Sequence, residues 1–518
     1  MNSPLKRPDL VPASTAGELP TLYAARLGDW YRDLVDDAHR RSLGHHLTPV
    51  GVARMMGKLA AVEGEHLRLL DPGAGTGILG AALCEALAGS SRPPKRVELV
   101  VYEIDDALRP ALEASLSHLA WWLGERGVEL RLDVRWADYI AANASLLQPS
   151  LLPADRPFDA VIANPPYFKL PRSDARARAC ASVVHGQPNI YALMMAIGVA
   201  SLREGGRFVF ITPRSYASGP YFRLFREWFF ARVVPTDLHV FESRTATFDA
   251  VLQEALITAG KRATRPSGKR SVNVSTSDGA ADVGSSRRRK LRLADVLRPG
   301  CANRVLRLPA NPAHDWAERI VARWTSSLHA QGLEVSTGPV VAFRSREFLR
   351  DRPGKSTIPL LWLQHVAPMR LTWPLNGHKL EHFLDCAASA PTILPNRNYV
   401  LLRRFSPKEE TRRIVAAPHV RRGSKDYARV AFENHLNYIH RPGSEMTEDD
   451  AFGVAALLNS RVLDTWFRVG SGNTQVSATE LRSTPLPDPE LIRDIGQRVR
   501  RRPEEFEAIV ASRLGYAG

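Results

Sequence analysis

The sequence predicts an α/β protein, with a doubly wound, Rossmann-like domain followed by a mixed α+β domain. Two features of the first half carry this prediction. Four apolar runs have the composition of buried parallel strands, helical segments separate them, and a polar residue follows each run. A glycine-rich turn comes directly after the first run. Ligands of such a sheet bind outside the carboxyl ends of its strands, so we expect the functional site along that edge.

Length and composition predict two folded domains. At 518 residues the chain exceeds the usual size of one domain. Its hydrophobic share of 44% and charged share of 24% are those of an ordinary globular protein. A change of composition to Lys, Arg, Ser, Gly and Asp indicates a basic linker or exposed hairpin at residues 261–292. We therefore expect one domain at residues 1–260 and a second at residues 293–518.

The charge balance favours a polyanionic partner. Lys and Arg total 70 against 54 Asp and Glu, which gives a formal net charge of +16. Nucleic acid is the first candidate, and a merely basic surface is the alternative. Arg287-Arg-Arg-Lys290 in the basic segment could lie along DNA phosphates, with a solvated tether as the equal alternative.

Cysteine usage and the absence of long apolar runs predict a cytoplasmic protein without a metal site or a membrane span. The N-terminus has no apolar core followed by a cleavage site, and no long charge-free apolar run occurs. The cysteines lack the paired spacing of a zinc or redox site, so we expect reduced thiols. They are Cys84, Cys180, Cys301 and Cys386.

A short stretch, His45-His46-Leu47-Thr48-Pro49, precedes the glycine turn. Pro49 suits the start of a helix over residues 50–61, and Thr48 suits its N-cap. The two histidines are expected at the surface or in packing, because no other metal ligands accompany them.

The first expected strand, at residues 67–70, leads into Asp71-Pro-Gly-Ala-Gly-Thr-Gly77. Gly73, Gly75 and Gly77 allow a tight turn and a close backbone approach to a cofactor. The spacing differs from the dinucleotide and P-loop patterns, and no Lys-Ser/Thr follows for a phosphate. Asp71 would repel a phosphate and suits a cationic ligand.

Acids follow the second and third expected strands. Residues 97–102 end at Glu103, in the position where a ribose diol would be held. Residues 130–136 lead to Asp138, which could accept a hydrogen bond from an adenine amine. A solvated loop acid is the alternative for either one alone.

The fourth expected strand, at residues 158–163, ends at Asn164-Pro165-Pro166-Tyr167. The prolines cannot continue a strand ladder, so the chain must leave the sheet in a stiff loop. Asn164 offers an amide, Pro165 a carbonyl and Tyr167 an aromatic face, which together suit a flat, nitrogen-bearing ring. A simple strand-terminating turn is the alternative.

These elements, in this order, resemble the class I S-adenosylmethionine-dependent methyltransferases that methylate adenine N6 in DNA. The position of Thr48-Pro49 ahead of the glycine motif is similar to the gamma class, and the match covers approximately residues 21–260. The resemblance implies that the cofactor is S-adenosyl-L-methionine. The implied cofactor residues are Thr48, Pro49, Asp71, Gly73, Gly75, Gly77, Glu103 and Asp138. The implied catalytic residues are Asn164, Pro165, Pro166, Tyr167 and, as a second stacking face, Phe248, for which a core phenylalanine is the alternative.

Residues 293–518 carry a second, weaker resemblance. Asn434–Ile439, an apolar helix expected from Ala451 to Trp466, and residues 470–487 resemble the recognition regions of restriction-modification methyltransferases and specificity subunits. This implies a DNA target-recognition domain. Gly472-Asn-Thr-Gln475 would supply amide side chains for base edges, with a polar connecting loop as the alternative.

The resulting hypothesis is a site-specific adenine-N6 DNA methyltransferase that flips its target adenine. Its substrate would be double-stranded DNA, and a separately encoded restriction endonuclease is a plausible partner. A protein-glutamine or RNA N-methyltransferase is one alternative, because Asn-Pro-Pro-Tyr fits other planar amines. A non-catalytic DNA-specificity protein is another. The large basic second domain favours DNA, and the complete set from Asp71 to Tyr167 argues against a degenerate site.

Overall fold

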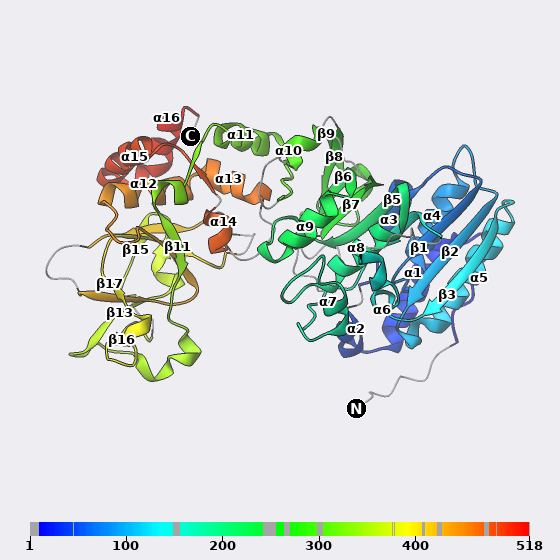
Figure 1. Ribbon diagram of the computed structural model, residues 1–518, viewed down its shortest axis with the longest axis horizontal. Helices are drawn as coiled ribbons and strands as arrows, with labels where there is room; N and C mark the ends of the chain where they lie inside the picture. Colours follow the sequence, from blue (N-terminus) through cyan, green and yellow to red (C-terminus); the bar gives the residue numbers. More distant parts are fainter. Residues whose placement is uncertain are drawn as a thin grey trace. The chain divides into compact units, whose positions relative to one another are not determined.

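The protein forms two compact units, Met1–Ala310 and Asn311–Gly518, in a computed structural model (Figure 1). The structure describes residues 10–44, 46–148, 156–241, 255–263, 270–297, 304–375, 377, 379–406, 410–421, 427–470, 476–482 and 484–516. Among these residues, no helix is long and apolar enough to cross a membrane.

The first unit is built around a sheet of nine described strands in the order β3-β2-β1-β4-β5-β7-β6-β8-β9. The strands are β1 (His66–Asp71), β2 (Arg96–Glu103), β3 (Glu129–Trp136), β4 (Phe158–Ala163), β5 (Leu202–Pro213), β6 (Val233–Phe241), β7 (Ala255–Arg262), β8 (Ser271–Ser277) and β9 (Arg287–Arg292). The first five are parallel, and β7 runs antiparallel to both β5 and β6. The predicted doubly wound α/β fold is confirmed.

The strand order reverses direction at β1, which pairs with β2 on one side and β4 on the other. The connection from β1 to β2 and the connection from β3 to β4 therefore run in opposite directions across the sheet. Such a switch point opens a crevice at the carboxyl ends of the strands, where open α/β sheets bind their ligands.

Alternate residues of each strand face opposite helical layers. On β5, Phe208 and Phe210 join one core, whereas Val209 and Ile211 join the other. Helices on the Val209 side are α1 (Pro20–Leu34), α3 (Val50–Ala60), α4 (Ile78–Ala88) and α5 (Arg109–Gly124). Helices on the Phe208 side are α6 (Tyr139–Asn143), α8 (Ile190–Ser201) and α9 (Arg223–Phe230). The short helices α2 (Asp37–Leu43), α7 (Ala175–Ala179) and α10 (Leu293–Val296) lie in connections.

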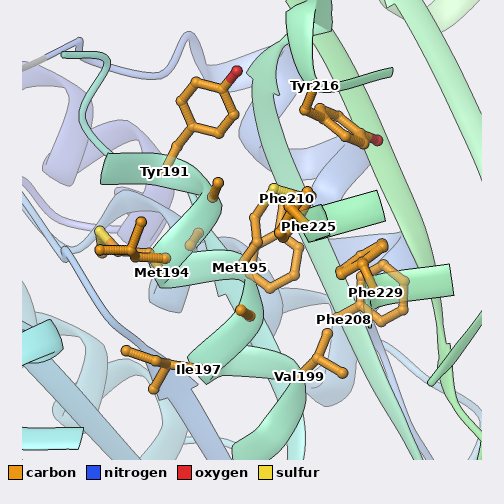
Figure 2. Packing of buried hydrophobic residues seen from close by; sticks show 14 of the residues in the cluster. Tyr191, Met194, Met195, Ile197, Val199, Phe208, Phe210, Tyr216, Phe225 and Phe229 are labelled. Atoms are coloured by element: carbon orange, nitrogen blue, oxygen red, sulfur yellow. The ribbon is translucent and has the colours of Figure 1, made fainter. Parts of the chain in front are cut away.

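Helix α8 is apolar on all its faces, so it can be buried on several sides by neighbouring elements (Figure 2). Phe208 and Phe210 of β5 stack at 5.5 Å between ring centroids, and Phe229 of α9 meets Phe208 edge-on at the same distance. Gly198 allows α8 to approach closely, since an added Cβ would lie 3.0 Å from Phe210 Cζ. This aromatic layer fixes the helix that begins beside the functional site.

Residues 261–292 do not separate two domains. The described residues of this range, 261–263 and 270–292, include the C-terminal end of β7 and the strands β8 and β9, and β8 extends the sheet by pairing in parallel with β6. Val272 and Val274 of β8 are buried in the same core as β5. The expected hairpin is therefore an integral edge of the sheet, and the first unit continues to Ala310.

The second unit combines two sheets with a helical layer. One sheet has the order β11 (Glu334–Thr337), β21 (Leu436–His440), β18 (Tyr399–Arg403), β19 (Ala416–His419). The other has the order β12 (Leu349–Arg350), β16 (His382–Leu384), β13 (Thr357–Leu361), β20 (Arg429–Phe432), β17 (Leu394–Pro395). Two short pairs are β10 (Ser326–Ser327) with β22 (Pro485–Leu486) and β14 (Val366–Ala367) with β15 (Arg370–Leu371). The helices are α11 (Pro312–Val321), α12 (Glu448–Asn459), α13 (Arg461–Gly470), α14 (Ala478–Arg482), α15 (Pro489–Arg501) and α16 (Phe506–Leu514).

The single helix expected from Ala451 to Trp466 is wrong, because Ser460 divides it. Ser460 has an extended backbone, and its hydroxyl donates to the Leu457 carbonyl at 2.6 Å. Serine competes for backbone hydrogen bonds in this way and so favours helix ends. Helices α12 and α15 pack closely at Gly453 of α12 and Gly496 of α15. A Cβ added to Gly453 would lie 2.1 Å from the Ile492 carbonyl oxygen, and one added to Gly496 would lie 1.9 Å from the Asp449 carbonyl oxygen.

Candidate active site

A pocket of about 850 Å³, including its open mouth, lies at the switch point of the first unit. Its walls come from the segment before α3, from the ends of β1 to β4, and from α7 and α8. The lining residues are Leu43, Gly44, His46, Leu47, Pro72, Gly73, Tyr102, Glu103, Ile104, Leu108, Ala137, Asp138, Tyr139, Ile140, Asn164, Pro166, Phe168, Arg176, Ile190 and Met194.

The glycine turn after β1 forms the floor of the pocket. Gly75 (φ +58°) and Gly77 (φ +83°) adopt left-handed conformations that other residues seldom tolerate. An added Cβ at Gly77 would also lie 3.2 Å from Leu112 of α5. Gly73 lines the pocket directly.

Asp71 lies beneath the glycine turn rather than on the pocket wall. Its side chain is fully buried, and Oδ2 accepts a hydrogen bond from the Gly80 N–H at 3.1 Å. Oδ1 is buried without a hydrogen-bond partner among the described residues. Burial raises the pKa of Asp71 to about 7, and the charge of Glu103 adds to the rise. Asp71 therefore supports the turn from below, which differs from the direct ligand contact expected of it.

Glu103, at the end of β2, joins the glycine turn to the pocket wall. Its Oε2 accepts from the Gly75 N–H at 2.8 Å, and Oε1 accepts from the N–H groups of Ile104 and Asp105 at 2.8 and 2.9 Å. The residue is 5% exposed, and burial raises its pKa despite these three bonds. Each carboxylate oxygen accepts two hydrogen bonds, so Oε2 retains one position for a hydroxyl group.

Asp138 follows β3 and lines the same pocket. Its Oδ1 accepts from the Ala141 N–H at 2.9 Å, which caps α6, and its Oδ2 lies 3.1 Å from Arg176 Nη1. Arg176 also pairs with Asp174 at 2.8 Å. The sequence prediction missed Arg176, because an arginine in a short loop helix carries no motif that relates it to a strand end 38 residues earlier.

Asn164 and Tyr167 form a hydrogen-bonded pair at the pocket rim. The Tyr167 hydroxyl donates to Asn164 Oδ1 at 2.6 Å and has the Ile211 carbonyl as a second acceptor at 3.2 Å. Asn164 Nδ2 donates to the His46 carbonyl at 2.8 Å and to Thr48 Oγ1 at 3.1 Å. The Tyr167 ring stacks on the His46 imidazole, with 4.8 Å between centroids. Burial raises the pKa of Tyr167.

Thr48 does not cap α3, so that expectation is wrong. The N-cap is Pro49, without a side-chain hydrogen bond, and the Thr48 hydroxyl turns instead to Asn164. Neither Thr48 nor Pro49 is among the described residues that line the pocket, although Gly44, His46 and Leu47 are. Because Pro49 takes the N-cap position, Thr48 lies one residue before the cap, and its side chain does not cap the helix.

Two groups of predicted residues lie outside the described residues. They are Phe248, expected as a second stacking face, and Gly472-Asn-Thr-Gln475, expected as a recognition loop. The basic cluster lies on the edge strand β9. Arg288 pairs there with Asp237, and Arg289 Nη1 donates to the Pro309 carbonyl at 2.9 Å, so these two guanidinium groups already have partners in the first unit.

The charges of the pocket suit a cationic or neutral ligand that carries a diol and an amine. Glu103 and Asp138 stand at the ends of the neighbouring strands β2 and β3, and a buried Asp71 oxygen lies beneath the glycine turn that follows β1, on the other side of β2. The one arginine among the described lining residues, Arg176, is neutralised by two aspartates. This donor set fits S-adenosyl-L-methionine better than a nucleotide phosphate.

Fold and site together define a class, the Rossmann-like methyltransferases. The chain is 32% identical over 470 residues to the Type II methyltransferase M.BsuBI of Bacillus subtilis, a match that covers 89% of this chain and 91% of that protein. It is 31% identical over 478 residues to the Type II methyltransferase M.PstI of Providencia stuartii, covering 90% and 91%. A family model, the Eco57I restriction-modification methylase, matches residues 132–247. The chain therefore belongs to the Type II methyltransferases, the DNA methyltransferases of restriction-modification systems.

A solved structure shares the fold. The Type IIL restriction-modification enzyme MmeI, determined in complex with DNA, aligns with a TM-score of 0.55 and 12% sequence identity. The alignment covers 96% of this chain and 79% of MmeI.

Proposed function

We propose that the protein methylates the N6 amine of adenine in double-stranded DNA, with S-adenosyl-L-methionine as the methyl donor and the target base turned out of the helix. The orientation of the Asn164 amide carries this proposal. Both N–H groups of the amide face protein acceptors, so the pocket rim presents the carbonyl oxygen. An acceptor beside an aromatic ring recognises an amine on a flat heterocycle.

The cofactor would lie over the glycine turn, with Glu103 accepting from its ribose and Asp138 from its adenine amine. When bound, the cofactor supplies a methyl group on a positively charged sulfur. Asp138 must divide its Oδ2 between Arg176 and the ligand, because Oδ1 already caps α6. The acids also favour the positive charge electrostatically.

Asn164 Oδ1 and the Pro165 carbonyl would accept the two N6 hydrogens of the flipped adenine. These bonds turn the nitrogen lone pair toward the methyl group and favour the partial positive charge that grows on nitrogen during attack. The N6 nitrogen would bond to the methyl carbon as the bond from that carbon to sulfur breaks, and one N6 proton would then leave to the solvent. No covalent bond to the enzyme is needed.

Tyr167 would supply an aromatic face for the extrahelical base. The His46 imidazole occupies one face of the ring, with an interplanar angle of 26°. A flipped adenine therefore stacks on the opposite face or replaces the imidazole. The formal charge of +16 supports affinity for DNA, and we assign target recognition to the second unit. A separately encoded restriction endonuclease is the expected partner.

Methyl transfer from tritiated S-adenosyl-L-methionine to duplex DNA, followed by nucleoside chromatography, tests the proposal. Unmodified genomic DNA is the substrate, because it contains all short recognition sequences. The label should appear in N6-methyladenine. Label in cytosine, in RNA or in a protein glutamine offered in parallel would contradict the assignment of the substrate.

A further inference from the structure

We propose that Thr48 is a positioning residue for the catalytic amide of Asn164, rather than a contact to the cofactor. The proposal deepens the function proposed above and rests on it. The two residues lie 116 positions apart in the sequence, and Asn164 Nδ2 donates to Thr48 Oγ1 at 3.1 Å.

A primary amide has two ends of similar size, so packing alone does not select its orientation. Hydrogen bonds must do so. The His46 carbonyl is only an acceptor, and it lies 2.8 Å from Asn164 Nδ2. If the amide were reversed, its oxygen would face this carbonyl oxygen. The His46 carbonyl therefore excludes the reversed amide.

Thr48 completes the selection by accepting from the second N–H of the same nitrogen. Both donors are then used, and Oδ1 retains two acceptor positions. The Tyr167 hydroxyl occupies one of these positions. The remaining position is available for one hydrogen of the target amine, as the proposed methyl transfer needs.

The burial of Thr48 and its freedom from capping support this role. Thr48 is 7% exposed, and α3 begins without any side-chain cap. The Thr48 hydroxyl makes no capping hydrogen bond to α3, and Thr48 is not among the described residues that line the pocket. Its bond to Asn164 is the side-chain hydrogen bond that explains a buried threonine at this position.

The segment that carries Thr48 is held firmly against the Asn-Pro-Pro-Tyr loop. Gly44 adopts a left-handed conformation (φ +65°), and an added Cβ would lie 3.1 Å from the Tyr167 backbone nitrogen and 2.9 Å from Phe168 Cδ1. The stacking of His46 on Tyr167 adds a second contact. Gly44, His46 and Thr48 thus position the amide and the ring of the loop together, before DNA binds.

Thr48→Val, Thr48→Ser and the matched control Thr21→Val test the proposal. Valine keeps the shape of threonine but cannot accept, and serine restores the hydroxyl. Thr21 is also buried, and its hydroxyl bonds to Glu85 at 2.9 Å between α1 and α4, away from the pocket. The measurements are kcat for tritiated methyl transfer at saturating DNA, and the cofactor Kd by calorimetry.

We expect Thr48→Val to lower kcat about tenfold, as the loss of one hydrogen bond to a reacting group would, with the cofactor Kd unchanged. Thr48→Ser should recover most of the activity, and Thr21→Val should change only the melting temperature. A weaker cofactor Kd with unchanged kcat in Thr48→Val would instead make Thr48 a cofactor contact. Equal losses of kcat in the valine and serine variants would show that Thr48 contributes through packing and not through its hydroxyl. Product analysis of the wild-type reaction separately tests the proposed function, so the two failures are distinguishable.

Discussion

The two halves of the pocket are held by different kinds of bond. On the side that we assign to the cofactor, Glu103 accepts three hydrogen bonds from backbone N–H groups, two of them from the residues that directly follow it. On the side that we assign to the target amine, Asn164 is held by His46 and Thr48, which are 118 and 116 residues away in the sequence. Glu103 is thus held by its sequence neighbours and by a turn 28 residues away, whereas the Asn164 amide nitrogen is held by a segment more than 100 residues away.

This difference predicts how each half responds to substitution. The Glu103 carboxylate is part of the backbone hydrogen bonding of the glycine turn, so removing it disturbs both the turn and the ligand. The Asn164 side chain serves the rim of the pocket alone. Changes in the amine half should therefore affect turnover, whereas changes in the cofactor half should affect affinity and stability together.

Asn164→Ala should have the largest effect on turnover. A change in cofactor affinity in this variant would contradict the proposed difference between the two halves of the pocket. We expect kcat to fall about 10³-fold, because removing a group that stabilises developing charge costs 10²–10³ in related cases. Calorimetry should show an unchanged cofactor Kd, and a DNA filter-binding assay should show nearly unchanged affinity. Asn273→Ala in β8, which loses the hydrogen bond that its side-chain amide donates to Asp237 of β6, is the control for folding. Full turnover in Asn164→Ala would overturn the mechanism.

Glu103→Ala should weaken cofactor binding about 30-fold, since hydrogen bonds to a charged group contribute roughly 1.5–3 kcal/mol. The melting temperature should fall as well, because three backbone donors at the end of β2 and in the glycine turn lose their acceptor. Calorimetry and thermal unfolding measure the two effects. Glu129→Ala, at the exposed start of β3, is the control. An unchanged affinity would remove Glu103 from the cofactor site.

Tyr167→Ala should lower kcat about tenfold, in line with roughly 1–3 kcal/mol for the stacking of a base on an aromatic side chain. The substitution also removes the partner of the His46 ring. Fluorescence of 2-aminopurine at the target position should show fewer extrahelical bases, while the cofactor Kd stays constant. A lost cofactor affinity would mean that the two halves are coupled.

Asp71→Asn should make the stability of the first unit less dependent on pH. Burial raises the pKa of Asp71 to about 7, whereas an aspartate in an unfolded chain titrates near 4. Protonation thus stabilises the folded state; this contribution is complete below about pH 4 and is lost as the pH rises through 7. Because asparagine does not ionise, the melting temperature of the variant relative to wild type should increase from pH 5 to pH 8. Asp106→Asn, at an exposed position, is the control.

The same difference explains how much could be predicted from the sequence. The glycine turn and Glu103 follow their strands directly, so strand-end patterns locate them. The Asn-Pro-Pro-Tyr loop is recognisable because proline must end β4. The contact of Thr48 with Asn164 and the pairing of Arg176 with Asp138 are tertiary contacts between loops far apart in the sequence. No local sequence pattern predicts such contacts. The basic hairpin was equally hidden, since the alternate burial of Val272 and Val274 becomes meaningful only when β6 lies beside β8.

Tyr167→Phe should have the smallest effect, a loss of about threefold in kcat, near the lower limit for one neutral hydrogen bond. Phenylalanine keeps the ring and its stacking on His46. The hydroxyl has two acceptors, Asn164 Oδ1 at 2.6 Å and the Ile211 carbonyl at 3.2 Å, so it can move to the carbonyl when a target amine occupies Oδ1. The orientation of the amide still depends on His46 and Thr48. A loss of kcat as large as that of Thr48→Val, measured in the same methyl-transfer assay, would show that the Tyr167 hydroxyl fixes the orientation of the Asn164 amide. His46 and Thr48 would then have only a supporting role.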